Sequence, residues 1–366
     1  MNKSQSLTKI ALQKFKKDRW GVFSLAFIGL LILMAIFAYM LAPDTSKNAN
    51  QMHLSIHSKP PGFKVLMLTI PIENKTENGS FFNYFTGFES AATEVPILNY
   101  TTDNQTVIYT EYSEEPALAQ QKQVPLSVFQ TNGANKKIEN YITEKKFYLG
   151  TDKYGRDVLS RLLIGSRVSI AIGFIGVFIS LLIGIPIGAI SGFYGGKVDA
   201  FFMWLINIVW SIPTVLLVIA ITLALGKGFW QVFVAVGLTM WVEVARVVRG
   251  QVMSVKEMQY VTAAKALGYS NFRIVTHHVL PNVLSPVFVI SAANFASAIL
   301  IESGLSFLGL GAQPPVPSWG GMIKDHYHYI ILGKAYLAVI PGFAMLLLVL
   351  AVMLVGNSLR DALDVK

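Results

Sequence analysis

Six apolar stretches, each long enough to cross a lipid bilayer as a helix, constrain the fold of this chain more than any other feature. A membrane-spanning helix needs about 20 mostly apolar residues. The sequence is 53% hydrophobic and only 14% charged, whereas soluble domains carry about 25% charged residues. We therefore expect an all-α membrane protein that crosses the bilayer several times. The six predicted spans are residues 21–41, 168–190, 201–225, 229–248, 283–301 and 335–356.

The basic residues predict which side of the membrane each loop faces. Residues 1–20 hold five lysines and one arginine against one aspartate, and cytoplasmic flanks are enriched in lysine and arginine. Counting spans from a cytoplasmic N-terminus places the polar segment 260–281 and the C-terminus in the cytoplasm too. We therefore attribute the net charge of +9 to the cytoplasmic flanks of a membrane protein rather than to nucleic-acid binding. The residues at and before this segment agree with the count: Arg246, Arg249, Lys256, Lys265 and Arg273 oppose only Glu243 and Glu257.

Four regions follow from this layout. Residues 1–20 are a cytoplasmic basic N-terminus, and residues 21–42 hold the first span, whose apolar run exceeds the roughly 7–15 residues of a signal peptide. Residues 43–147 form an insertion that we expect outside the cytoplasm, and residues 148–366 hold the other five spans. In the insertion, the runs 64–70 and 106–112 are typical of β-strands. A disordered loop is the alternative for this region.

The segment 260–281 combines a short helical run, Gly268, a second helical run and Pro281. Glycine suits the left-handed turn that ends many helices, and proline does not continue a helix. The pattern predicts a rigid protrusion on the cytoplasmic surface that another protein could bind. An ordinary hairpin lying on lipid headgroups is the alternative.

Three motifs resemble the permease subunits of ATP-binding-cassette importers. TAAKALG at 262–268, followed by Leu280-Pro281, is similar to their "EAA" loop, which has Glu-Ala-Ala, a glycine four positions later and then Leu-Pro. Residues 149–169 and 302–323 resemble the segments before the second span and after the fifth span of peptide and nickel permeases. Thr262 stands where the family usually has glutamate, so the resemblance does not extend to an acidic contact there.

The resemblance implies that the 260–281 segment contains a coupling helix that docks into a partner ATPase. Small alanine side chains let a helix approach a groove closely, Val261 and Leu267 offer apolar contacts, and Lys265 and Arg273 offer charge pairing. The predicted coupling residues are Thr262, Ala263, Ala264, Lys265, Leu267, Gly268, Arg273, Leu280 and Pro281.

The chain itself is not expected to hydrolyse ATP or to bind a cofactor or metal. It lacks the GxxxxGK[ST] loop that cradles phosphates, so we expect ATP and Mg²⁺ on partner subunits. It has no cysteine, which excludes disulfides and thiolate ligands. His326 and His328 are interpreted as solvent-exposed polar residues rather than metal ligands.

Four polar or kinked positions inside or beside spans are candidates for a transport pathway or gate: Asn207, Pro213, Asn294 and Glu302. Each has a structural alternative, because intramembrane polar groups also join helices and proline also kinks them. For Glu302 the favoured alternative is a carboxylate that anchors the following loop. Residues 149–167 have apolar residues at helical spacing and predict an amphipathic helix on the outer membrane surface.

Together the motifs predict one permease subunit of an ATP-driven importer in a bacterial plasma membrane, with peptides as substrate. The resemblance implies a second homologous permease, two nucleotide-binding subunits and an external solute-binding protein as partners. Nickel or another small solute is an alternative cargo. A membrane-anchored receptor or assembly protein that uses the insertion, and a passive channel, are the alternative functions.

Overall fold

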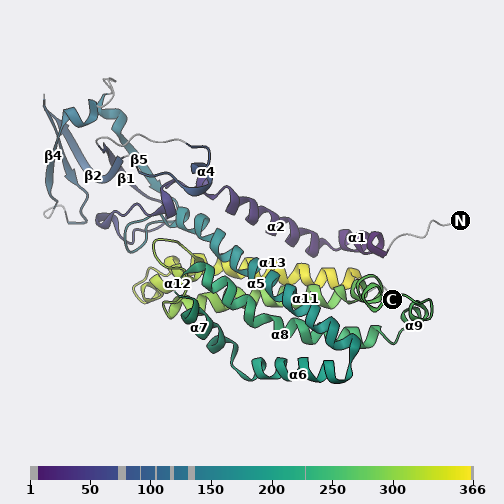
Figure 1. The fold of residues 1–366 in the computed structure, drawn as a ribbon. Helices are drawn as coiled ribbons and strands as arrows, with labels where there is room; N and C mark the ends of the chain where they lie inside the picture. The colour runs from purple at the N-terminus through teal and green to yellow at the C-terminus, as the bar shows by residue number, and fades with distance from the viewer. Residues whose placement is uncertain are drawn as a thin grey trace. The chain divides into compact units, whose positions relative to one another are not determined.

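The computed structural model describes residues 7–72, 80–90, 92–103, 105–115, 119–130, 137–226 and 228–363. Residues 1–6 of the predicted basic N-terminus therefore lie outside the described residues. The chain divides into two compact units (Figure 1). The helical unit comprises Met1–Ile32, Val168–Gln313 and Gly342–Lys366, and the insertion unit comprises Leu33–Arg167 and Pro314–Pro341.

Five helical segments of the described residues are long and apolar enough to cross a membrane, and a sharply bent helix pair would make a sixth. The predicted spans 168–190, 229–248 and 283–301 fall inside single helices. The five are α2 (Arg19–Ile36), α5 (Val158–Tyr194), α8 (Phe229–Val255), the continuous segment Asn271–Phe307 and α13 (Tyr336–Leu363). The segment Asn271–Phe307 consists of α10 (Asn271–Ile274), a π-helical turn (Val275–Val279) and α11 (Leu280–Phe307).

The predicted span 201–225 is not one helix. It is divided into α6 (Gly196–Ser211) and α7 (Thr214–Leu225), which meet at an angle of 88°. Ile212 is extended, with φ −89° and ψ 126°, because the ring of the following Pro213 disfavours helical geometry in the residue before it. The kink predicted at Pro213 is thus present, and it is sharp enough to redirect the chain.

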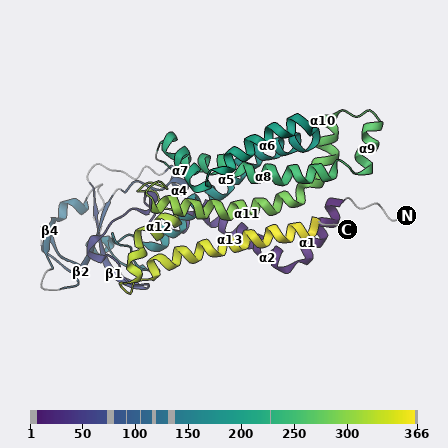
Figure 2. The ribbon, with the colours of Figure 1, turned by 90° about the horizontal axis from the view of Figure 1, so that it is seen from below.

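Close contacts between helices build the helical unit. Gly184 and Gly188 of α5 face α8: a Cβ added at Gly184 would lie 2.6 Å from Val244 Cβ, and one at Gly188 would lie 2.5 Å from the Ala245 carbonyl oxygen. Only glycine permits this approach, as expected for small-residue packing in membranes. Near the start of α2, Ser358 of α13 donates a hydrogen bond to Asp18. Figures 1 and 2 show the beginning of α1 (Leu7–Lys17), the end of α13 and α9 (Gln259–Ala266) at the same end of this unit.

The insertion unit contains an antiparallel sheet of five strands in the order β4-β3-β2-β1-β5. The strands are β1 (Phe63–Pro71), β2 (Ala92–Thr102), β3 (Thr106–Glu111), β4 (Gln121–Pro125) and β5 (Ile142–Phe147). The two runs that predicted strands coincide with β1 and β3. Leu68, Ile97, Val107 and Phe129 pack into a buried core on the sheet, so apolar burial stabilises this region.

Short helices complete the insertion unit. They are α3 (Ala38–Leu41), α4 (Asn83–Thr86), α12 (Trp319–His326) and the 3₁₀ turns Lys47–Ala49, Leu54–Ile56, Leu126–Gln130, Ile138–Tyr141 and Tyr327–Ile330.

The amphipathic surface helix predicted over 149–167 is wrong. Residues up to Asp157 form turns, and the Asp157 carboxylate then accepts a hydrogen bond (2.8 Å) from the Ser160 backbone N–H, as a helix N-cap does. The helix that starts at Val158 continues to Tyr194. Asp157 and Arg161, which would form the polar face of such a helix, are 3% and 6% exposed.

Candidate functional site

The segment predicted to couple to a partner is a short helix closed by a glycine turn. Helix α9 ends at Ala266, and Gly268 follows with φ 78°. The Gly268 N–H donates to the Lys265 carbonyl (3.0 Å), and the Tyr269 N–H donates to the Ala264 carbonyl (3.2 Å). These two bonds form a Schellman motif, which needs the left-handed residue that glycine supplies. The turn predicted at Gly268 therefore has a defined geometry.

One face of α9 is buried in the helical unit itself. Val261 is 0% exposed and Ala264 is 4% exposed. Both pack in a cluster with Val252 and Val255 of α8 and with Ile274 of α10. The expectation that Val261 fills a pocket in a partner is therefore wrong, because its side chain already fills one here. The small Ala264 side chain also packs against the core of the helical unit rather than against a partner.

The opposite face of the segment is exposed and partly apolar. Thr262, Ala263 and Lys265 are exposed, and the Leu267 side chain is 72% exposed. Phe272 of α10 is 77% exposed and was not among the predicted residues. The sequence signal for it was an aromatic residue in a polar, basic segment. Large exposed apolar side chains are typical of surfaces that bind another protein.

The two predicted cations of this segment lie on aromatic rings. The Lys265 ammonium is 5.3 Å from the centre of the Phe193 ring, and the Arg273 guanidinium is 4.6 Å from that of Tyr269. The Tyr269 ring in turn stacks on His278, with ring centres 5.9 Å apart. Within the described residues neither cation forms an ion pair, so both charges remain available on the surface.

The prediction that a helix ends at Pro281 is wrong. The chain remains helical through Leu280 and Pro281 and continues as α11. Just before them, Val275–Val279 widens into a π-helical turn, and such turns change the local hydrogen-bond spacing. The Asn282 side chain also donates a hydrogen bond (2.7 Å) to the His278 carbonyl. Pro281 thus sits near the first turn of α11, where a missing N–H is tolerated.

The four predicted pathway residues have different surroundings. Asn294 and Glu302 of α11 are 1% and 0% exposed, and the Ser306 hydroxyl donates to Glu302 (2.8 Å). Asn207 of α6 is exposed and accepts a hydrogen bond (2.6 Å) from Arg246 of α8. Pro213 is exposed at the break between α6 and α7. In this conformation Asn294 and Glu302 therefore lie inside the helix packing.

A cavity of about 290 Å³ lies at the same break. Its lining includes Trp210 and Thr214 beside the break, Glu243 of α8 and Ser297 of α11. The sequence reasoning counted Glu243 only among the charges that set topology. The missed signal was its position, because a single carboxylate in the middle of an apolar helix indicates a functional site.

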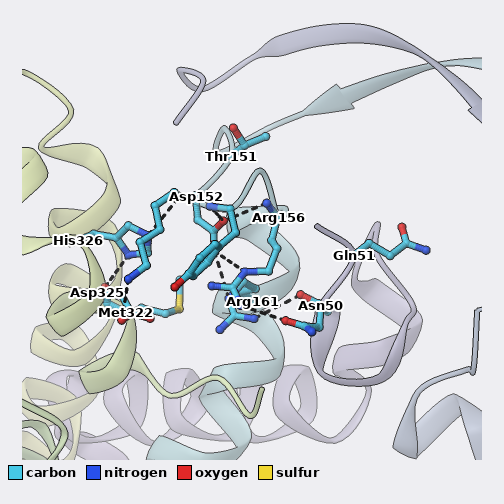
Figure 3. Close-up of polar contacts among 12 residues, drawn as sticks. Asn50, Gln51, Thr151, Asp152, Arg156, Arg161, Met322, Asp325 and His326 are labelled. Carbon is cyan, nitrogen blue, oxygen red and sulfur yellow. Dashed lines mark hydrogen bonds and ion pairs between the residues drawn. The ribbon is translucent and has the colours of Figure 1, made fainter. Parts of the chain in front are cut away.

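In the insertion unit, buried charges hold the segment before α5 in place (Figure 3). The Asp152 carboxylate accepts a hydrogen bond (2.7 Å) from Arg156 Nε and lies 3.7 Å from Arg161 Nε. Arg156 also donates to the Asn50 side chain (3.0 Å). All three charged side chains are less than 10% exposed. One carboxylate thus pairs with two arginines, and the Arg156–Asn50 bond ties the beginning of the insertion to the segment before α5.

His326 of α12 is part of this region, and its predicted solvent exposure is wrong. It is 2% exposed; its Nδ1 is 2.7 Å from the Met322 carbonyl oxygen, and its Nε2 accepts from the Lys153 N–H (3.4 Å). Burial lowers the pKa of His326, which favours the neutral ring that this pattern needs. His328 is exposed, as predicted.

Asp152→Ala should destabilise the insertion unit strongly. The change leaves two buried arginines without their carboxylate, and breaking a buried pair in this way costs about 3–5 kcal/mol. We expect faster protease cleavage of the insertion in the purified, membrane-embedded chain. Glu144→Ala is the matched control, because it removes the exposed Lys64–Glu144 pair (3.0 Å), and such pairs contribute at most about 1 kcal/mol. Equal cleavage rates for the two variants would contradict the structural role of Asp152.

Comparison with known proteins identifies two matching family models. The family described as "Binding-protein-dependent transport system inner membrane component" matches residues 184–366, which include α9. The "N-terminal TM domain of oligopeptide transport permease C" matches residues 6–61. The residues between the two matches, 62–183, contain the five-stranded sheet.

Curated bacterial proteins are similar to more than half of the chain. The dipeptide transport system permease protein of Alkalihalophilus pseudofirmus is 39% identical over 219 residues, which cover 60% of this chain and 72% of the relative. The oligopeptide transport system permease protein of Haemophilus influenzae is 40% identical over 219 residues, covering 60% and 70%. The di/tripeptide transport system permease protein of Pseudomonas aeruginosa is 41% identical over 224 residues, covering 61% and 73%.

Proposed function

The chain belongs to the family of binding-protein-dependent transport system inner membrane components, and we propose on this basis that it carries peptides across the bacterial plasma membrane as one permease subunit of an ATP-driven importer. It is a transport subunit and not an enzyme. The observation that carries the peptide assignment is the 39–41% identity to permeases named for dipeptides, di/tripeptides and oligopeptides. Nickel import and a receptor role are less favoured, because these relatives are named for peptide transport.

Family membership implies a partner ATPase and a second permease subunit. We propose two nucleotide-binding subunits, which bind ATP and Mg²⁺, and an external solute-binding protein that delivers the peptide. The absence of a phosphate-binding loop in the sequence supports the assignment of ATP to the partners.

The proposed topology places the N-terminus, the C-terminus and α9 in the cytoplasm. Two observations support it. The beginning of α1, the end of α13 and α9 lie at the same end of the helical unit (Figures 1 and 2), and residues 1–20 and the residues before α9 are rich in lysine and arginine. The sheet of residues 43–147 would then lie on the external side, where it could shape the surface that receives the binding protein.

The two faces of α9 suggest how ATP drives transport. Its exposed residues, including Leu267 and Lys265, would contact the ATPase, while Val261 and Ala264 are packed against α8. A close-packed interface transmits displacement rather than absorbing it. Closure of the ATPase pair would therefore move α8 with α9 and switch access from one side of the membrane to the other, as in alternating access.

Reconstitution of the assembled transporter tests this function. We expect proteoliposomes with the chain, its partner permease, the ATPase subunits and the binding protein to accumulate a labelled tripeptide only when ATP is hydrolysed. Uptake without ATP would indicate a passive channel, and ATP-dependent uptake of Ni²⁺ without any peptide uptake would contradict the peptide assignment.

A further inference from the structure

Glu243 lies near the middle of a membrane-spanning helix and is exposed on its surface. Helix α8 runs from Phe229 to Val255, so Glu243 is about 21 Å from its start and about 18 Å from its end at 1.5 Å per residue. Its side chain is exposed in this chain, although Val242 and Val244 beside it are buried. A carboxylate within a membrane-spanning helix is costly against lipid, so such residues face protein or a water-filled path.

The neighbouring cations do not neutralise Glu243. Arg246 is one turn further along α8, but its guanidinium lies 3.5 Å from the centre of the Trp210 ring and donates to Asn207 (2.6 Å). Arg249, the next turn, forms a paired contact with Asp199 of α6 at 2.5 and 2.6 Å. In the part of the chain that the structure describes, Glu243 forms no hydrogen bond or ion pair. It is therefore a carboxylate without a counter-ion near the middle of α8.

This carboxylate opens onto the cavity at the α6–α7 break. The cavity has a volume of about 290 Å³, and Thr214 and Ser297 line it together with Glu243. Their hydroxyl oxygens can accept hydrogen bonds, and Ile212 and Leu300 supply apolar walls. An ammonium group has three N–H donors and one positive charge, which match one carboxylate and two hydroxyls. The cavity volume is at the small end of the range for ligand-binding pockets, so the cavity suits the terminal residue of a peptide rather than a whole peptide.

We propose that Glu243 binds the α-ammonium group of a peptide as it passes through this cavity. The proposal rests on the proposed function in its choice of substrate, and it adds a specificity-determining residue on α8. Every peptide with a free amino terminus carries this group, so the contact selects for a feature common to the substrates rather than for one sequence.

A charge-selective chemical probe tests the carboxylate without relying on peptide transport. The chain contains no cysteine, so Ser297→Cys places a single thiol in the cavity of the assembled complex in nanodiscs. The probes are a trimethylammonium methanethiosulfonate and a sulfonate methanethiosulfonate. We expect the cationic-to-anionic rate ratio to be at least about tenfold higher with Glu243 than in the E243Q background. Thr101→Cys is the control, because this residue of β2 is exposed and lies outside both the cavity and α9. Its rate ratio should be the same in both backgrounds.

Three results of this experiment would overturn the proposal. One is an equal rate ratio at Ser297→Cys with and without E243Q. Another is a thiol that reacts with neither reagent in the assembled complex, because the cavity is then covered. The third is a cationic preference that appears in the isolated chain and disappears in the complex, which would show that a cationic side chain of the second permease neutralises Glu243.

Uptake measurements then separate this proposal from the proposed function. With E243Q, the KM for a peptide with a free amino terminus should rise at least about tenfold, while the KM for its N-acetylated form should not change. E243D should restore most of the preference. If wild-type complex imports no peptide at all, the proposed function fails, and the thiol experiment still decides whether Glu243 attracts ammonium groups. If E243Q imports both peptides as wild type does, Glu243 does not bind the amino terminus.

Discussion

Gly268→Pro is expected to reduce ATP-driven uptake by the assembled transporter more than tenfold while the chain still inserts into the membrane. Proline requires φ near −65°, whereas Gly268 has φ 78°. Proline also removes the N–H that bonds to the Lys265 carbonyl. The Schellman motif between α9 and α10 cannot form with this residue, at a cost of about 3 kcal/mol or more. The ATPase would bind α9. Without the turn after α9, closure of the ATPase should no longer displace α8, and ATP hydrolysis should continue without uptake.

Gly333→Pro is the matched control. Gly333 also has positive φ (74°), has open space around its Cβ position and donates its N–H to a carbonyl three residues earlier, Ile330. It lies in the insertion unit, outside the proposed ATPase contact. We expect this variant to retain coupled uptake. Normal uptake with Gly268→Pro, or equal losses in the two variants, would contradict a special role for the α9 turn.

The second large effect concerns binding of the ATPase. Replacing Leu267 and Phe272 together by aspartate should prevent its co-purification with the permease. The two side chains are 72% and 77% exposed, so the change should leave the fold intact. Fully burying one such side chain contributes about 1.5–3 kcal/mol. Loss of two predicts an affinity lower by about 10²–10⁴-fold, since each 1.4 kcal/mol is a factor of ten.

The control for this double variant places the same substitutions on another exposed apolar pair. Ile331 and Leu332 are 90% and 67% exposed and precede α13. The Ile331→Asp, Leu332→Asp variant should bind the ATPase as the unchanged chain does. If it loses the ATPase equally, or if the Leu267 and Phe272 variant keeps it, the exposed face of α9 and α10 is not the binding surface.

The features that local residue chemistry determines were predictable from the sequence. Long apolar runs predicted helices that the structure contains, such as α8. Pro213 predicted the break after α6, because a proline acts on the residue directly before it. Short runs of β-prone residues predicted β1 and β3, and Gly268 predicted the end of α9. Each of these depends on neighbours within a few residues.

Features that depend on contacts between distant residues were not predictable in the same way. Val261 and Leu267 are both apolar and belong to one short segment, yet Val261 is buried and Leu267 is exposed. Which side faces the core depends on where α8 and α10 lie. Asp157 and Arg161 were interpreted as a polar helix face, yet both are buried. Arg161 donates to the carbonyl oxygens of Asn48 and Ala49, which lie 113 and 112 positions earlier in the chain. Pro281 was predicted to end a helix, because the π-helical turn that precedes it has no local sequence signature.

The predicted pathway residues also depend on contacts between distant parts of the chain. Asn294 and Glu302 were selected because they are polar residues within or beside an apolar helix, and this reasoning does not say which way a side chain points. The structure buries both. Glu243 has the same chemistry, but the α6–α7 break leaves space beside it. The cavity is lined by four helices, α6, α7, α8 and α11, so its lining requires the tertiary structure.

Cross-linking from Leu267 tests the central claim, that α9 carries movement from the ATPase into the permease. The chain has no native cysteine, so a short cleavable thiol-to-amine cross-linker attaches to a Leu267→Cys variant of this chain at one position. We predict a covalent adduct with the ATPase subunit, loss of peptide uptake while the link is intact, and recovery when the link is cleaved. Ile331→Cys should give no such adduct. An adduct from Ile331→Cys but none from Leu267→Cys, with uptake unaffected, would contradict the account.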